Sequence, residues 1–243
     1  MINEVFTGSK AYLKNNLFEL HKSLFSSEIY DQNFMFLKRS PNINEFLKTE
    51  DILVENCINN FLLFKLNFDL IPNDILLNLI QSKNYSINKL LVYTVNQKIF
   101  KYYDTQNIGI TINPLSKNTH VDFLDLKWKQ DIEYGEIFAL QNRKFMIKML
   151  ETNSINYFLA KKGEKIVGLI STIEHPDNIE IYDLYVLPNF RGNNIATALQ
   201  KKAINSYDKN FIVIADNSDT PKFMYQKLGY QQIHFWYEFQ KEL

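Results

Sequence analysis

A polar turn with one glycine separates a strand-like run from a helix-like run late in the chain. The junction reads Pro188-Asn189-Phe190-Arg191-Gly192-Asn193-Asn194-Ile195-Ala196. A helix that follows a tight turn gathers its free N–H groups and the positive end of its dipole at one point, where a phosphate can bind. Gly192 would let the backbone approach that group, Arg191 adds a cation, and Asn193 or Asn194 can cap the helix. The alternative, favoured by the turn taken alone, is a capped turn without a ligand.

The elements that must position this turn are predicted from hydrophobic periodicity. In the second half, the sequence predicts strands at 108–113, 157–161, 166–174, 179–187, 211–215 and 232–239, and helices at 119–135, 136–152, 195–204 and 220–228. The Lys162-Gly163-Glu164 turn joins two of these strands as a hairpin. The helix after the junction has one apolar stripe, which is typical of a helix packed on a sheet. The pattern is that of an α/β domain.

The first half also mixes helix and strand. Spacing of apolar residues predicts an amphipathic helix within 9–26, strands at 34–37, 60–68 and 90–95, and a helix at 73–81 capped by Asn73. Only Gly8 precedes residue 109, so a backbone that approaches a phosphate closely is expected in the second half. A polar stretch at 103–107 marks the predicted boundary. We therefore expect an N-terminal α/β domain at 1–106 and a second domain at 107–243.

Composition excludes several classes of protein. The longest apolar runs fall far short of the ~20 residues of a membrane helix, and no signal peptide is recognisable. One cysteine, Cys57, cannot form an internal disulfide, and no Cys/His cluster has metal-ligand spacing. Residues 1–106 carry 11 basic and 11 acidic side chains, and residues 107–243 carry 16 of each, which argues against a nucleic-acid partner. We expect a cytoplasmic protein with no membrane, nucleic-acid or metal partner.

The order of motifs resembles the GNAT family of acetyltransferases over about residues 108–240. Strand, Pro188, Arg-Gly turn, helix, strand and a final Tyr225-Gln226-Lys227-Leu228-Gly229-Tyr230 segment occur in the order of that family. The resemblance implies a GNAT acyltransferase fold, α/β with a mixed sheet, preceded by a smaller α/β domain. It also implies acetyl-CoA as cosubstrate, and no metal.

The resemblance assigns the coenzyme site residue by residue. The turn would wrap the pyrophosphate, and the implied residues are Arg191, Gly192, Asn193, Asn194, Ile195 and Ala196. The preceding strand would bind the pantetheine arm through Leu184 and Val186, and Asn217 is implied as a further contact to the arm. Asn194 departs from the pattern, because it stands where the family has its first motif glycine. Its N–H remains, and asparagine tolerates left-handed geometry better than most residues. For Asn217, a helix cap is the alternative.

The same resemblance implies that Tyr225 is the general acid that protonates the departing thiolate. The alternative for Tyr225 is packing in the core. A general base must take a proton from the amine, and Asp183 and Glu180 on the preceding strand are the candidates, with Glu174 and His175 behind them. Each of these has an exposed strand or turn position as its alternative.

In this family the two helices after the first strand choose the acceptor, and here they span 119–152. They carry acidic and aromatic side chains, among them Asp131, Glu133 and Trp128, that could receive a cationic amine, although Lys127 and Lys129 interrupt the acidic run. A solvated helix face is the alternative. The expected activity is N-acetyl transfer from acetyl-CoA to a small-molecule or peptide amine by direct attack in a ternary complex; a noncatalytic acyl-CoA-binding module is the alternative.

The first half lacks an Arg/Gln-x-x-Gly turn. Our hypothesis is that it is a degenerate GNAT-like domain that binds no coenzyme and helps shape the acceptor site. An unrelated packing domain is the alternative. Whether the protein is a monomer or a homodimer stays open at this stage.

Overall fold

The chain folds into two compact units. The computed structural model describes residues 5, 8–23, 29–57, 60–102 and 109–243. The N-terminal unit consists of Thr7–Val92, Ala215–Asp219 and Ile233–Leu243, and the C-terminal unit includes Tyr93–Ile214 and Thr220–Gln232. The predicted boundary at 103–107 lies outside the described residues. No helix in the described part of the chain is both long and apolar enough to cross a membrane.

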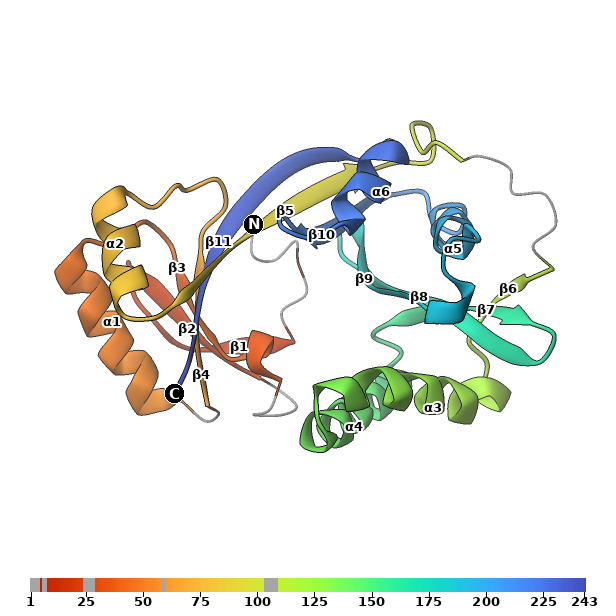
Figure 1. The fold of residues 1–243 in the computed structure, drawn as a ribbon, viewed down its shortest axis with the longest axis horizontal. Helices are drawn as coiled ribbons and strands as arrows, with labels where there is room; N and C mark the ends of the chain where they lie inside the picture. Colours follow the sequence, from red (N-terminus) through yellow and green to blue (C-terminus); the bar gives the residue numbers. More distant parts are fainter. Residues whose placement is uncertain (1–4, 6–7, 24–28, 58–59, 103–108) are drawn as a thin grey trace. The chain divides into compact units, whose positions relative to one another are not determined.

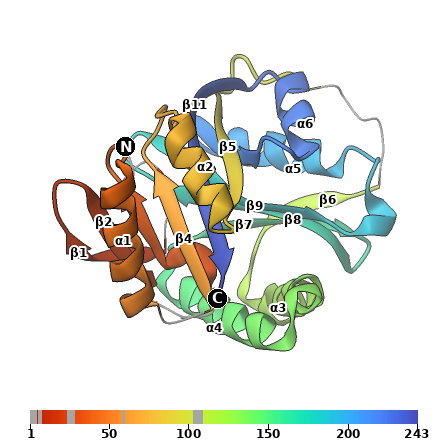
Figure 2. The same ribbon diagram turned by 60° about the vertical axis from the view of Figure 1, so that its left-hand side comes forward.

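The N-terminal unit is a sheet with two helices on one face (Figure 2). Its elements are β1 (Ser9–Lys14), β2 (Phe18–Ser23), β3 (Phe34–Leu37), α1 (Ile43–Asn56), β4 (Phe61–Leu66), α2 (Asp74–Ser82) and β5 (Ser86–Val95), and the strand order is β1-β2-β3-β4-β11-β5, where β11 is Gln231–Glu242. The buried aromatic rings of Phe46, Phe64 and Tyr85 pack together between helix and sheet. The predicted cap of α2 is confirmed, because the Asn73 side chain accepts a hydrogen bond from the N–H of Leu76.

The helix predicted within 9–26 is wrong, because this segment forms the antiparallel hairpin of β1 and β2. Asn15 Oδ1 accepts hydrogen bonds from the N–H groups of Leu17 (2.8 Å) and Phe18 (2.9 Å), which closes a turn that a helix cannot contain. Phe18 and Leu20 then alternate into the core, as strand residues do. Residues 24–26 of the predicted helix lie outside the described residues.

The C-terminal unit contains the elements predicted around the polar turn, except the strand predicted at 232–239, which is β11 and lies in the N-terminal unit from Ile233 on. Its elements are β6 (Thr111–Pro114), α3 (His120–Asp131), α4 (Glu136–Thr152), β7 (Asn156–Lys162), β8 (Lys165–Glu174), β9 (Asn178–Val186), α5 (Ile195–Ile204), β10 (Asn210–Asp216) and α6 (Pro221–Lys227), with strand order β5-β10-β9-β8-β7-β6. Helices α3 and α4 lie on one face of β7, β8 and β9, and α5 lies on the other (Figure 1). The α/β fold class with a mixed sheet is confirmed.

The two units repeat one chain path. β1-β2-β3-α1-β4-α2-β5 has the same order as β7-β8-β9-α5-β10-α6-β11, and in each the first three strands are antiparallel and the fourth is parallel to the third. The last strands are exchanged, since β11 pairs with β4 and β5 lies next to β10. This pairing explains why Ile233–Leu243 belongs to the N-terminal unit, whereas the sequence placed it with 107–243.

Candidate active site

The polar turn between β9 and α5 borders a cavity of about 430 Å³ in the C-terminal unit. The lining residues come from the end of β9, the turn, the first turn of α5 and α6: Val186, Phe190, Arg191, Gly192, Asn194, Ile195, Ala196, Thr197, Phe223, Met224, Lys227 and Leu228. Two of them, Arg191 and Lys227, are cations, and no Asp or Glu of the described residues lines the cavity. The cavity is therefore suited to an anionic ligand with an apolar portion.

The backbone of the turn leaves the start of α5 open. Gly192 has φ +77°, and a side chain there would meet open space, so its glycine is required by backbone conformation and not by crowding. Asn194 precedes the helix with φ 56°, in the left-handed region, and no side chain in the described residues caps α5. Asn193 instead donates to the carbonyls of Phe190 and Arg191, both at 3.2 Å. The first N–H groups of α5 thus have no side-chain acceptor, and their residues line the cavity.

Arg191 is exposed, and its guanidinium is anchored at one point. Its Nε donates to the carbonyl of Val186 at 3.0 Å, which fixes the side chain beside the end of β9. The guanidinium carbon lies 6.0 Å from the centre of the Tyr185 ring. Its terminal nitrogens can therefore donate to a phosphate without first leaving a carboxylate partner.

The predicted pantetheine residues are placed differently from one another. The ladder between β9 and β10 covers only Asn178–Ile181, so Leu184 and Val186 lie beyond it, and Val186 lines the cavity. Leu184 pairs with Ile170 of β8 and is half-buried. Asn217 belongs to the N-terminal unit, where its N–H donates to the carbonyl of Lys89 at 2.9 Å. The geometry of the C-terminal unit groups the turn residues with Val186, and does not include Asn217.

Tyr225 lies on α6 and is buried. Its ring packs against Tyr93 and Tyr230, with centroids 6.3 Å and 5.2 Å away. Tyr225 itself does not line the cavity, but Met224 and Leu228 on the same helix do. Tyr230 is fixed by a 2.8 Å hydrogen bond from its hydroxyl to Gln200 Oε1, so Tyr225 has a rigid neighbour.

The two candidate bases on β9 have separate polar partners. Glu180 is buried and Glu180 Oε2 is 2.9 Å from His175 Nε2, which brings together two of the four predicted groups. Asp183 Oδ2 lies 2.8 Å from Lys127 Nζ of α3, and 20% of the Asp183 side chain is exposed. The remaining candidate, Glu174, pairs with Lys209 at 2.8 Å. Asp183 therefore contacts α3 through Lys127.

Lys127 is the residue of this site that sequence analysis missed. The sequence analysis named Lys127 only as an interruption of the acidic run, with a solvated helix face as one alternative, whereas only 7% of its side chain is exposed. The available signal was the i,i+4 spacing to Asp131, which the structure shows as a 3.7 Å ion pair. Such spacing is common on exposed helices, so it could not reveal burial.

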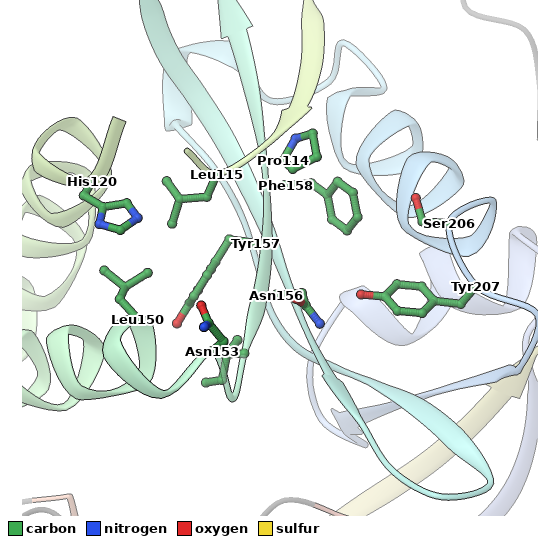
Figure 3. A pocket seen from close by; sticks show the side chains of 11 residues that line it. Pro114, Leu115, His120, Leu150, Asn153, Asn156, Tyr157, Phe158, Ser206 and Tyr207 are labelled. Atoms are coloured by element: carbon green, nitrogen blue, oxygen red, sulfur yellow. The ribbon is translucent and has the colours of Figure 1, made fainter. Parts of the chain in front are cut away.

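A second cavity, of about 450 Å³, surrounds the start of β7 in the C-terminal unit. Figure 3 shows His120, Leu115, Leu150 and Tyr157 on one side of the strand and Phe158, Ser206 and Tyr207 on the other. The Tyr207 hydroxyl lies 3.1 Å from Thr172 Oγ1. None of the site residues predicted from the sequence lines this cavity.

Comparison with known proteins finds a family model that matches part of the chain. Residues 130–241 match the model of the acetyltransferase (GNAT) domain. An uncharacterized N-acetyltransferase of Methanocaldococcus jannaschii is 28% identical over 138 residues, which cover 50% of this chain and 61% of that protein. The chain thus spans about three fifths of the length of this curated relative.

Solved structures share the fold of the chain. A conserved protein from Staphylococcus epidermidis has a TM-score of 0.89 at 21% identity and covers 100% of this chain and 97% of its own. A GCN5-related N-acetyltransferase from Kribbella flavida has a TM-score of 0.64 at 11% identity, covering 96% of this chain and 90% of its own. At these identities the likeness concerns the fold.

Proposed function

We propose that the protein is an N-acetyltransferase that transfers the acetyl group of acetyl-CoA to a primary amine. The match of residues 130–241 to the model of the acetyltransferase (GNAT) domain supports this proposal. The observation that carries this proposal is the cavity at the uncapped start of α5. Its combination of free helix N–H groups, a cation and no carboxylate among the described lining residues suits a pyrophosphate.

In the proposed complex the turn binds the coenzyme. The N–H groups of Gly192 to Ala196 would donate to the pyrophosphate oxygens, and Arg191 would pair with the same group. The backbone of Leu184 to Val186 lies past the β9–β10 ladder and would bind the pantetheine arm. The thioester would then lie beside β9. The apolar side chains of Val186, Met224 and Leu228 would cover the arm.

The reaction we propose is direct attack. The amine nitrogen forms a bond to the acetyl carbonyl carbon, the C–S bond breaks, and the coenzyme thiolate takes a proton from the Tyr225 hydroxyl. The proton lost by the amine nitrogen passes to a carboxylate on β9. Between the two candidates we favour Asp183, since it is partly exposed, whereas Glu180 is 3% exposed and held by His175.

We further propose that the N-terminal unit is a GNAT-like domain that has lost its coenzyme site. It repeats the chain path of the C-terminal unit, but α1 begins with a capping box: Asn42 Oδ1 accepts from the N–H of Glu45, and Glu45 Oε2 accepts from the N–H of Asn42. The N–H groups of Asn42 and Glu45 are therefore occupied, and the Glu45 carboxylate would repel a pyrophosphate.

The proposal is tested by release of free coenzyme A thiol from acetyl-CoA across a panel of small amines, polyamines, aminoglycosides and peptides. We expect turnover with at least one amine, and a roughly 10²- to 10⁴-fold lower kcat in Tyr225→Phe, the range for loss of a general acid. Tyr12→Phe, the same change at an exposed tyrosine that does not line the cavity, is the matched control.

Wild-type turnover that Tyr225→Phe leaves unchanged would contradict the role of Tyr225 while keeping the enzyme. Binding of acetyl-CoA without thiol release with any amine would instead favour a noncatalytic acyl-CoA-binding protein.

A further inference from the structure

A buried ammonium connects α3 to the strand that carries the proposed base. Lys127 Nζ donates to Asp183 Oδ2 at 2.8 Å and to Gln130 Oε1 at 2.8 Å, and it lies 3.7 Å from Asp131 Oδ1. Asp131 in turn accepts a 2.6 Å hydrogen bond from Asn142 of α4. One cation and two carboxylates thus form a closed cluster on the α3 face of β9.

The cluster keeps its lysine charged. Burial by itself would lower the pKa of Lys127, but the carboxylates of Asp183 and Asp131 more than offset it, so the pKa is raised. Burial raises the pKa of Asp131 in spite of Lys127 and Asn142. With both carboxylates ionised, the cluster carries one excess negative charge. Asp183 is the more exposed of the two carboxylates, at 20% of its side chain against 6% for Asp131.

A row of side chains across the sheet leads to the same carboxylate. Tyr157 of β7 is opposite Ser171 of β8, and Ser171 is opposite Asp183 of β9, so the three side chains lie on one face. Ser171 is fully buried, and within the described residues its Oγ has no hydrogen-bond partner. The Ser171 Oγ has less than 1 Å² of accessible surface, so a water or an amine reaches this unpartnered hydroxyl only when neighbouring side chains move.

We propose that Lys127 is a positioning residue for deprotonation of the acceptor: its ammonium holds the Asp183 carboxylate on the α3 face, and Ser171 Oγ binds the amine, or the water that carries its proton, beside it. This inference rests on the proposed function. In the step, an N–H bond of the amine breaks and an O–H bond forms on Asp183, directly or through that water. Lys127 keeps its protons throughout and supplies only position and charge.

Other titratable groups face Asp183 from the elements packed around it. Asp131 and Lys127 face it from α3. Tyr157 on β7 has its pKa raised by burial and by the charge of Asp183. Tyr185 on β9 has its pKa raised by burial, and it also interacts with the charges of Arg191, Glu133 and Lys127. Among these groups, Lys127 is the ammonium in direct contact with Asp183.

The test is the pH profile of kcat/KM in Lys127→Met. Without the ammonium, two carboxylates remain together and the proton that must leave Asp183 is held more tightly, so we expect the acid limb of the profile to move to higher pH by about one unit or more. Lys127→Arg should return the limb toward its wild-type position. Lys129→Met, at an exposed lysine on the same helix, is the matched control and should keep the wild-type profile.

A uniform loss of activity in Lys127→Met with an unmoved acid limb would contradict the inference, because a purely structural lysine gives that result. A wild type that releases no thiol with any amine would contradict the proposed function first, and this inference with it.

Ser171→Ala is the second test, since it leaves the charges in place. Removing a hydroxyl that has no partner should not lower thermal stability. We expect about a tenfold lower kcat with an unchanged KM for acetyl-CoA, on the order of one lost hydrogen bond. Wild-type kcat in this variant would contradict the role of Ser171.

Discussion

The residue with the least ordinary conformation in the site is Asn194. It occupies the left-handed region at φ 56°, where the family resemblance expects glycine, and the sequence correctly indicated that asparagine could adopt it. Its side chain does not cap α5, so the helix start stays open. The local physics of one residue was therefore predictable, as it was for the Asn73 cap.

Substitution at this position should change stability in opposite directions. Asn194→Ala places a β-carbon in left-handed geometry and should lower the free energy of unfolding by about 1 kcal/mol, whereas Asn194→Gly should keep or slightly raise it. Urea unfolding of the two variants measures both. Equal stability of the alanine and glycine variants would show that the turn relaxes out of this conformation.

Lys127 shows where sequence reasoning at this scale stops. Its neighbours on α3 are charged on several sides, and a lysine is rarely buried unless paired. Its partner Asp183 is 56 residues away along the chain, so only the folded unit brings the pair together. The sequence indicated Asp183 as a candidate base from its strand, but it did not indicate the contact with Lys127.

At the scale of elements, the strands and helices around α5 followed from periodicity, and the first hairpin did not. Apolar residues at 11, 13, 17 and 20 satisfy a helical spacing and a strand spacing about equally well. The Asn15 side chain decided between them by binding the N–H groups of Leu17 and Phe18. The turn at Asn15 therefore determined the structure of this segment, and the helical spacing of its apolar residues did not.

The capping box of α1 makes a pH-dependent contribution to stability. The Arg39 guanidinium, with the N–H of Asn42, lowers the pKa of Glu45 to about 2 from the ordinary 4.5. A lowered pKa in the folded state means that the contribution is fully present above pH 4.5 and is lost as the pH falls toward about 2.

We therefore expect the melting temperature to fall less between pH 5 and pH 3 in Glu45→Gln than in the wild type. Glu55→Gln, at an exposed position near the other end of α1, is the control and should follow the wild type. Circular dichroism melts at the two pH values give the comparison. An identical fall in Glu45→Gln and the wild type would mean that the ionised capping box contributes nothing.

At the scale of the molecule, the chain path is repeated and the last strands are exchanged, but the two units differ at the start of the corresponding helices α5 and α1. The C-terminal unit has an open helix start with Arg191, and the N-terminal unit has a capped one in which Arg39 binds Glu45 at 2.7 Å. The exchange of β5 and β11 was not predictable, because a strand's hydrophobic pattern specifies which face is buried and not which distant strand it joins.

The central claim is that one coenzyme binds at the turn before α5, and calorimetric titration with acetyl-CoA tests it most directly. We expect one site per chain, a Kd raised about tenfold or more by Arg191→Ala, and no change of Kd in Arg39→Ala, the matched arginine of the N-terminal unit. Two sites per chain, or equal loss of affinity in both variants, would contradict the account.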